Sequence, residues 1–214
     1  MNTAADTPVQ RKPSRRGFWL KHLARWHWIS SALSLVGMLA FAITGFTLNH
    51  AGAIEASPRV IHHQASLSPV LAQALARKPT TEEAPLPPVM RAWLRDEWQV
   101  RVGDAAAQWS PDEVYLSLPR PGGDAWLAID LAAGTLEYER TDRGWIAWLN
   151  DLHKGRNAGP WWSWFIDVFA LACVVFCVTG FLLLSMHAKH RAATWPMVGL
   201  GLLVPLLLAL LFIH

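Results

Sequence analysis

Residues 25–50 read RWHWISSALSLVGMLAFAITGFTLNH, an apolar segment with a histidine near each end, His27 and His50. Residues 152–187 read LHKGRNAGPWWSWFIDVFALACVVFCVTGFLLLSMH and repeat this arrangement, with His153 before the apolar run and His187 at its end. Neutral imidazole is a ligand of haem iron, and facing helices of a bundle are where haem sites are built. These two segments therefore decide both the fold class and the kind of site to look for.

The composition is typical of a membrane protein. Hydrophobic residues make up 52% of the 214 residues and charged residues only 16%. The net charge of +3 is unevenly distributed, because residues 1–25 carry six basic residues and one acidic residue. Basic residues do not gather on a folded domain as they do in nucleic-acid-binding proteins, so no nucleic acid is expected as a partner.

Three uncharged runs of about 19 residues, 29–47, 168–186 and 195–213, predict three transmembrane helices. Basic residues precede the first run and lie between the second and third, so the positive-inside rule places both flanks in the cytoplasm. Tryptophans gather at the ends of the runs, as in an interfacial aromatic belt. We expect a multi-pass protein in the lipid bilayer of a bacterial inner (cytoplasmic) membrane, with a cytoplasmic N-terminus.

The long polar segment after the first run predicts a small extracytoplasmic α+β domain. Apolar residues at helical spacing indicate helices over 67–78 and 89–97, and alternation indicates strands over 98–102, 113–118, 125–130 and 135–139. Residues 144–153 place Trp145 and Trp148 on one helical face, which favours a helix lying in the membrane interface. The alternative is an ordinary core helix of the outer domain.

The expected organisation follows from these elements. It comprises a basic cytoplasmic tail (1–25), a first transmembrane helix (26–50), an extracytoplasmic domain (51–142), an interfacial segment (143–160), a second transmembrane helix (161–187), a cytoplasmic loop (188–194) and a third transmembrane helix (195–213). Residues 51–53 have the small-x-small form of a signal-peptide cleavage site, but the long apolar run before them favours an uncleaved helix.

Antiparallel helices would group the four histidines into two pairs. His50 and His153 would share one membrane face, and His27 and His187 the other, which predicts one or two haem b groups. His27 and His50 are about 34 Å apart along a straight helix, so they cannot ligate one haem. His190 is an alternative to His187, and the alternative for all of them is a purely interfacial role.

Three further features are candidates. Asp167 lies within the second apolar segment, where it could accept a hydrogen bond from a ligating histidine, pair with Arg156 or remain a surface acid. FAITGF (41–46) and FCVTGF (176–181) repeat, and their glycines allow close approach of a helix or a flat macrocycle. Cys173 and Cys177 are either a redox pair or, as we favour, small buried hydrophobes.

The chain resembles the PepSY-associated transmembrane family. The resemblance lies in residues 25–50, in WLAIDLAAGTLEYERTDRGWIAWLNDLHKGR (126–156) and in the second apolar segment with its TGF motif. In that family a strand ending in Asp, a Gly turn and another strand close a PepSY-type domain just before a Leu-His motif. Here those elements fall on 125–130, Gly134, 136–139 and Leu152-His153.

Larger members of that family include inner-membrane reductases of ferric siderophores that carry haem b on membrane histidines. The resemblance therefore implies that His27, His50, His153 and His187 are axial-ligand candidates. The larger members have more membrane helices and a second outer domain, which implies a homo-oligomer or an extracytoplasmic redox partner for this chain.

The expected function is electron transfer across the membrane, from the inner side or from a quinol to a ferric chelate or redox protein outside. Such a protein would be a transmembrane oxidoreductase of the ferric-reductase kind. Two alternatives stay open: a non-enzymatic membrane-anchored PepSY-type binding or regulatory protein, and an accessory subunit of a metal-uptake transporter.

Overall fold

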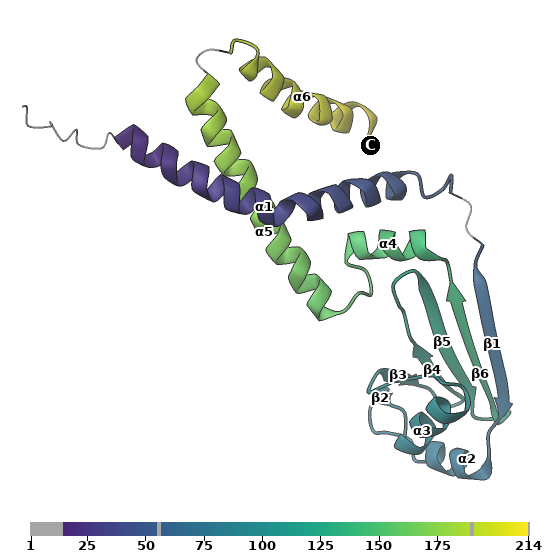
Figure 1. Cartoon of the computed structure of the whole chain (residues 1–214). Helices are drawn as coiled ribbons and strands as arrows, with labels where there is room; N and C mark the ends of the chain where they lie inside the picture. The colour runs from purple at the N-terminus through teal and green to yellow at the C-terminus, as the bar shows by residue number, and fades with distance from the viewer. Residues whose placement is uncertain (1–14, 55–56, 189–190, 214) are drawn as a thin grey trace, which may run out of the picture. The chain divides into compact units, whose positions relative to one another are not determined.

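The computed structural model describes residues 15–54, 57–188 and 191–213. Three of its helices are long and apolar enough to cross a membrane: α1 (Arg15–Asn49), α5 (Pro160–His187) and α6 (Thr194–Phe212). The prediction of three membrane-length helices is therefore confirmed (Figure 1). His190 and the first basic residues of the tail lie outside the described residues.

The chain divides into two compact units. Of the described residues, the first unit holds α1 up to Leu39, α5 from Asp167 and all of α6. The second unit, 40–166, holds the remainder of α1, the polar domain, α4 (Trp145–Lys154) and the start of α5.

In the first unit, α1 and α5 approach each other closely at Gly37, which has no side chain. A Cβ atom at this position would overlap the ring of Phe169. Ser30 and Ser34 are buried on the same helix, and their hydroxyls donate to the carbonyls of Trp26 (2.8 Å) and Ser30 (2.6 Å). Such back-bonding within a helix satisfies a polar group that has no water to bind.

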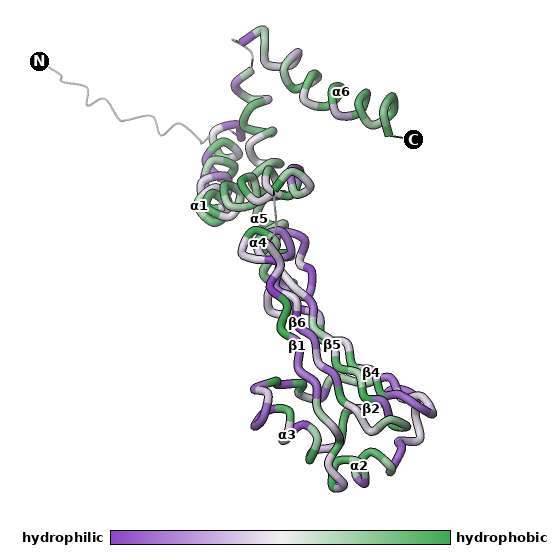
Figure 2. The backbone as a smooth tube through the Cα atoms, turned by 90° about the vertical axis from the view of Figure 1, so that its right-hand side faces the viewer, coloured by the Kyte–Doolittle hydropathy of each residue, from purple (hydrophilic) through white to green (hydrophobic). Residues whose placement is uncertain are grey.

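Helix α6 has no buried residue, and Figure 2 shows its predominantly apolar colouring. A helix that is apolar on all sides suits a lipid solvent. Pro205 lies inside α6 and removes one backbone donor there.

The second unit is built on a six-stranded antiparallel sheet with the order β1-β6-β5-β4-β3-β2. The strands are β1 (Arg59–Ser66), β2 (Glu83–Pro85), β3 (Ala106–Trp109), β4 (Glu113–Ser117), β5 (Gly123–Asp130) and β6 (Thr135–Asp142). The first and last strands pair along their whole length, from Arg59 opposite Asp142 to Ser66 opposite Thr135.

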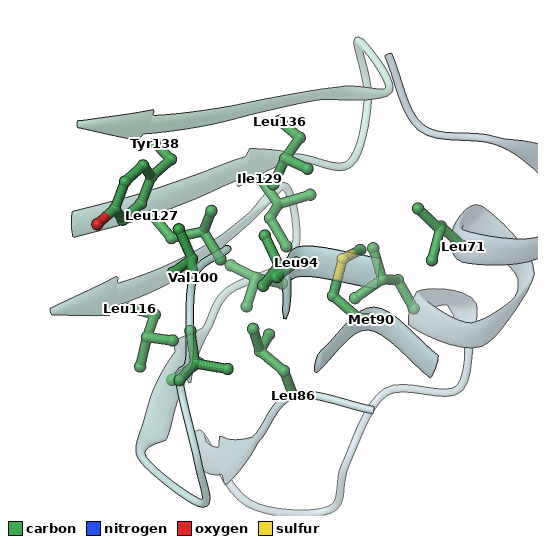
Figure 3. Packing of buried hydrophobic residues seen from close by; sticks show 14 of the residues in the cluster. Leu71, Leu86, Met90, Leu94, Val100, Leu116, Leu127, Ile129, Leu136 and Tyr138 are labelled. Atoms are coloured by element: carbon green, nitrogen blue, oxygen red, sulfur yellow. The ribbon is translucent and has the colours of Figure 1, made fainter. Parts of the chain in front are cut away.

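Two short helices, α2 (Pro69–Ala76) and α3 (Pro88–Glu97), cover one end of one sheet face. Leu71 from α2 and Leu94 from α3 pack with Leu127 and Ile129 of β5 in a single apolar core (Figure 3). Burial alternates along β5, as expected of a strand with one covered face. The α+β prediction is confirmed in class, because helices segregate to one face of an antiparallel sheet.

The sequence-based strands are only partly right. Residues 113–118, 125–130 and 135–139 fall on β4, β5 and β6, but the strand predicted over 98–102 is wrong. Gln99 there has φ of 56°, and the amide of Val100 donates to Leu94 O (3.0 Å), so the segment completes the end of α3. Strands β1, β2 and β3 were not predicted.

Helix α4 forms where the amphipathic helix was expected. Its polar residues Asn150 and Asp151 are each only 6% exposed, whereas Trp145 is 70% and Trp148 46% exposed. The helix therefore docks through its polar side and leaves its tryptophan side uncovered. This is the opposite of an ordinary core helix.

Candidate functional site

In the second unit, His153 of α4 lies against α1. Its Nδ1 atom is 2.7 Å from the hydroxyl oxygen of Thr44. The Phe41 ring lies against the imidazole, with centroids 4.9 Å apart. A Cβ atom added at Gly45 would be 3.4 Å from His153 Cε1. We call Phe41, Thr44 and Gly45 the His153 cradle.

In the first unit, His27 of α1 lies against α5 in the same way. Its Nδ1 atom is 3.1 Å from the Thr179 hydroxyl oxygen, and its ring stacks on Phe176 at 4.7 Å with an interplanar angle of 16°. A Cβ atom at Gly180 would be only 3.0 Å from His27 Cε1. Phe176, Thr179 and Gly180 form the His27 cradle.

The two cradles are the two copies of the repeated FxxTGF motif. Positions one, four and five of the motif lie on one helical face, since residues three and four apart are neighbours on a helix. The phenylalanine supplies a ring, the threonine a hydrogen-bond partner and the glycine the space for the imidazole. The sequence indicated that a group would approach each glycine closely, and in each copy that group is a histidine.

Sequence reasoning missed the role of the threonines. The signal was present in the spacing, because a Thr that precedes a Gly lies one turn after the Phe in both copies. Neither motif alone indicated which histidine it holds. The motif on α1 holds His153 of α4, and the motif on α5 holds His27, near the start of α1.

The threonine hydroxyls link each cradled histidine to a helix carbonyl. Thr44 Oγ1 is 2.9 Å from Ala40 O, and Thr179 Oγ1 is 2.6 Å from Val175 O. When the single hydroxyl proton goes to that carbonyl, the threonine oxygen accepts from Nδ1–H of the histidine. In this arrangement Nε2 has the lone pair that can bind a metal ion.

His27 has a carbonyl partner that His153 does not share among the described residues. Its Nδ1 atom is also 3.2 Å from the carbonyl oxygen of Phe176. A carbonyl oxygen can only accept, so this contact favours the Nδ1–H form of His27.

Helix α4 is positioned by three hydrogen bonds around His153. Thr47 on α1 donates to Asn150 Oδ1 (2.8 Å), and the buried amide of Gly122 donates to Asp151 Oδ2 (2.9 Å). The indole of Trp162 donates to Leu152 O (2.8 Å). These contacts hold the residues before and after His153, so the imidazole is presented to α1 by a fixed backbone.

His50 and His187 are exposed and lie apart from the cradles. His50 Nδ1 donates to Phe46 O (3.0 Å) and His187 Nδ1 donates to Leu183 O (2.8 Å), one turn earlier on their own helices. The carbonyl contacts of His27, His50 and His187 thus favour a proton on Nδ1 in these three histidines. Within the described part of the chain, neither predicted pair, His50 with His153 or His27 with His187, is in contact, so both pairings stay predictions.

The remaining candidates take no part in the cradles. Asp167 is exposed and forms no hydrogen bond or ion pair with another described residue. Cys173 and Cys177 are free thiols. Three or more potential metal-ligating side chains do not gather anywhere among residues 15–54, 57–188 and 191–213.

Neither the curated proteins nor the solved structures contain a match to this chain. A family described as putative PepSY_TM-like matches residues 18–214, which include α5, α6, the whole sheet domain and both cradles. The match covers far more than half of the sequence and agrees with the resemblance noted in its motifs. The chain belongs to the putative PepSY_TM-like family.

Proposed function

We propose that this protein is a haem b electron-transfer protein of the bacterial inner membrane, with His27 and His153 as iron ligands. The observation that carries the proposal is the pair of cradles. Each holds one imidazole at Nδ1, and with the ring proton on Nδ1 the Nε2 atom would be available to haem iron.

In each unit, one cradled histidine has the surroundings expected of a ligand to haem iron. A ligating histidine almost always donates its other ring N–H to a fixed partner, and Thr44 and Thr179 are such partners. Each threonine oxygen, by accepting that N–H, orients the ring and raises the basicity of Nε2. A neutral imidazole also avoids the free-energy cost of a charge near the membrane.

The second axial ligand would come from His50, His187 or a second copy of the chain. His50 and His187 are exposed and have the same Nδ1–H form as the cradled pair. Haem, when bound, would supply reversible one-electron transfer. The protein would hold the ligating rings in place and exclude water from them.

The direction of transfer rests on the distribution of charge and tryptophan. Basic residues near the start of α1 favour a cytoplasmic N-terminus, which would put the sheet domain outside the cytoplasm. The exposed tryptophan side of α4 supports a position in the membrane interface. The acceptor would then be a ferric chelate or a redox protein outside, and the donor a quinol or a reductant inside.

The test is visible spectroscopy of the full-length chain, purified in detergent from cells supplied with haem. We expect a b-type α band in the dithionite-reduced minus oxidised spectrum. His153→Ala and His27→Ala should each lower the haem content per chain, whereas His62→Ala, on an exposed site of β1, should not. Loss of the same part of the signal in His50→Ala and His153→Ala would support their pairing.

A preparation without the α band would overturn the proposal and favour a non-enzymatic membrane-anchored binding protein. Equal loss of haem in all variants, including His62→Ala, would also contradict it. Gel filtration and circular dichroism of each variant separate loss of haem from loss of fold.

A further inference from the structure

A cavity of about 430 Å³ opens on the core face of the sheet, beyond the end that α2 and α3 cover. Its walls come from β1, β6 and the segment after α3. The residues that matter here are His63, Trp98, Arg101, Arg120, Tyr138 and Arg140, which we call the Arg140 pocket. Its volume lies in the range of sites for small organic molecules.

Arg140 lies on the same face of β6 as the buried core residues, but near the end of the strand. Leu136, Tyr138 and Arg140 follow one another on the same side of β6, and the first two are buried in the core. Arg140 is opposite Ala125 on β5 and Ile61 on β1, past the last core residues. Tyr138 marks the edge of the packed core in Figure 3.

The pocket has an excess of positive charge, and no residue lining it is acidic. Arg120 pairs with Asp142 at 2.8 Å. The amide of Gly144, and to a lesser extent the nearby arginines, hold the pKa of Asp142 below its usual range, so this carboxylate stays ionised and balances Arg120. Arg101 and Arg140 form no salt bridge with a described residue, although Arg140 is one of the arginines near Asp142.

Arg140 also has an unsatisfied donor. Its Nε atom is buried and has no hydrogen-bond partner among the described residues. Buried donors without a partner are rare because each loses its hydrogen bond to water. This donor is closed to solvent, so a ligand in the pocket would meet the terminal nitrogens of the guanidinium; arginine binds carboxylates through two parallel hydrogen bonds.

The other wall of the pocket is made of flat rings. His63 stacks on Trp98 at 5.3 Å with an interplanar angle of 20°, and on Tyr138 at 6.1 Å and 22°. His63 is therefore part of a ring stack on the core face of the sheet. Near-parallel rings beside a cation favour a ligand that is itself planar.

We propose that the Arg140 pocket binds a small planar organic anion, with its carboxylate on Arg140 and Arg101 and its ring against Trp98 and His63. The inference does not depend on haem, because the cradled histidines lie outside the pocket. It adds a ligand site in the sheet domain to a protein whose proposed chemistry lies on the membrane helices.

The test is calorimetric titration of the full-length chain in detergent with three matched probes. Naphthoate has both the ring and the charge, naphthamide has the ring alone, and cyclohexanecarboxylate has the charge without a planar ring. We expect naphthoate to bind at least about tenfold more tightly than either of the others, with an affinity that falls as salt is added.

Variants then assign the site. Arg140→Met and Arg101→Met should each weaken naphthoate binding about tenfold, and Trp98→Leu should weaken it without abolishing the preference for the anion. Arg77→Met, which removes an exposed arginine at the end of α2, is the matched control. Arg101 is exposed, so its variant tests the site even if Arg140→Met fails to fold.

Two results would overturn the proposal. One is equal binding of naphthoate and naphthamide, or no binding of either at millimolar concentration. The other is unchanged naphthoate affinity in the folded Arg101→Met or Arg140→Met protein. These titrations need no haem, so they test the Arg140 pocket independently of the proposed function. Either test can fail while the other succeeds.

Discussion

Thr44 and Thr179 perform the same task with different degrees of redundancy. Each hydroxyl oxygen is within hydrogen-bond distance of a carbonyl of its own helix and of the Nδ1 atom of a histidine. Among the described residues, His153 Nδ1 has the threonine oxygen as its one hydrogen-bond partner, whereas His27 Nδ1 also has the Phe176 carbonyl. The two cradles, alike in sequence, should therefore respond differently to the same substitution.

Replacing each threonine by valine tests this difference. Thr44→Val removes the acceptor of His153 Nδ1, a loss of about 1–2 kcal/mol, and should move the proton of His153 toward Nε2. Thr179→Val should leave His27 largely in the Nδ1–H form, held by Phe176 O. Long-range proton–nitrogen NMR spectra of histidine-labelled protein distinguish the two forms, and Thr81→Val, at an exposed position of the sheet domain, is the control. A shift in both histidines, or in neither, would contradict the assignment.

At the scale of elements, the sequence predicted the helices and strands whose apolar residues recur at a regular spacing. The membrane helices, α2, α3, α4 and strands β4 to β6 all follow from the spacing of apolar residues. Strand β1 was missed because His62 and His63 look solvated, although β1 is held along its whole length by β6. Strands β2 and β3 are only three and four residues long, too short for a pattern.

The candidate site was predictable only in part, because the spacing of residues does not show which distant segments pack together. Its histidines and glycines were recognised but its threonines were not, and which helix faces which histidine depends on packing between segments far apart in sequence. The membrane ends suggested His50 as the partner of His153. The structure places Thr44 beside His153, six residues before His50 and on another side of the helix, and the pairing with His50 stays a prediction.

The docking of α4 gives a second prediction. Asp151→Ala would leave the buried amide of Gly122 without its acceptor, at a cost of about 1–3 kcal/mol. We expect faster hydrogen exchange across residues 145–154 and weaker retention of His153 in its cradle. Asp112 lies in an exposed turn, and its side chain forms no hydrogen bond or ion pair with another described residue. Asp112→Ala should therefore leave hydrogen exchange in α4 unchanged. Similar exchange in the two variants would show that Asp151 does not hold α4.

At the scale of the whole molecule, the proposed orientation has a direct test. In a chain carrying Cys173→Ala and Cys177→Ala, Asp112→Cys places a thiol in the turn between β3 and β4. A membrane-impermeant maleimide should label it in intact spheroplasts. Arg191→Cys, between α5 and α6, should be labelled only after lysis. The reverse pattern would place the N-terminus outside the cytoplasm.

The pairing of the first and last strands also has a mechanical consequence. Arg59 and Asp142 face each other at the point where the chain enters and leaves the sheet. Tension between the chain before Arg59 and the chain after Asp142 would pull β1 and β6 apart across their hydrogen bonds. These bonds would then break one after another, from Arg59 toward Ser66. Such peeling needs much less force than sliding the strands past each other. The sheet would therefore yield first at its membrane-connected end and last at the hairpin end beside α2.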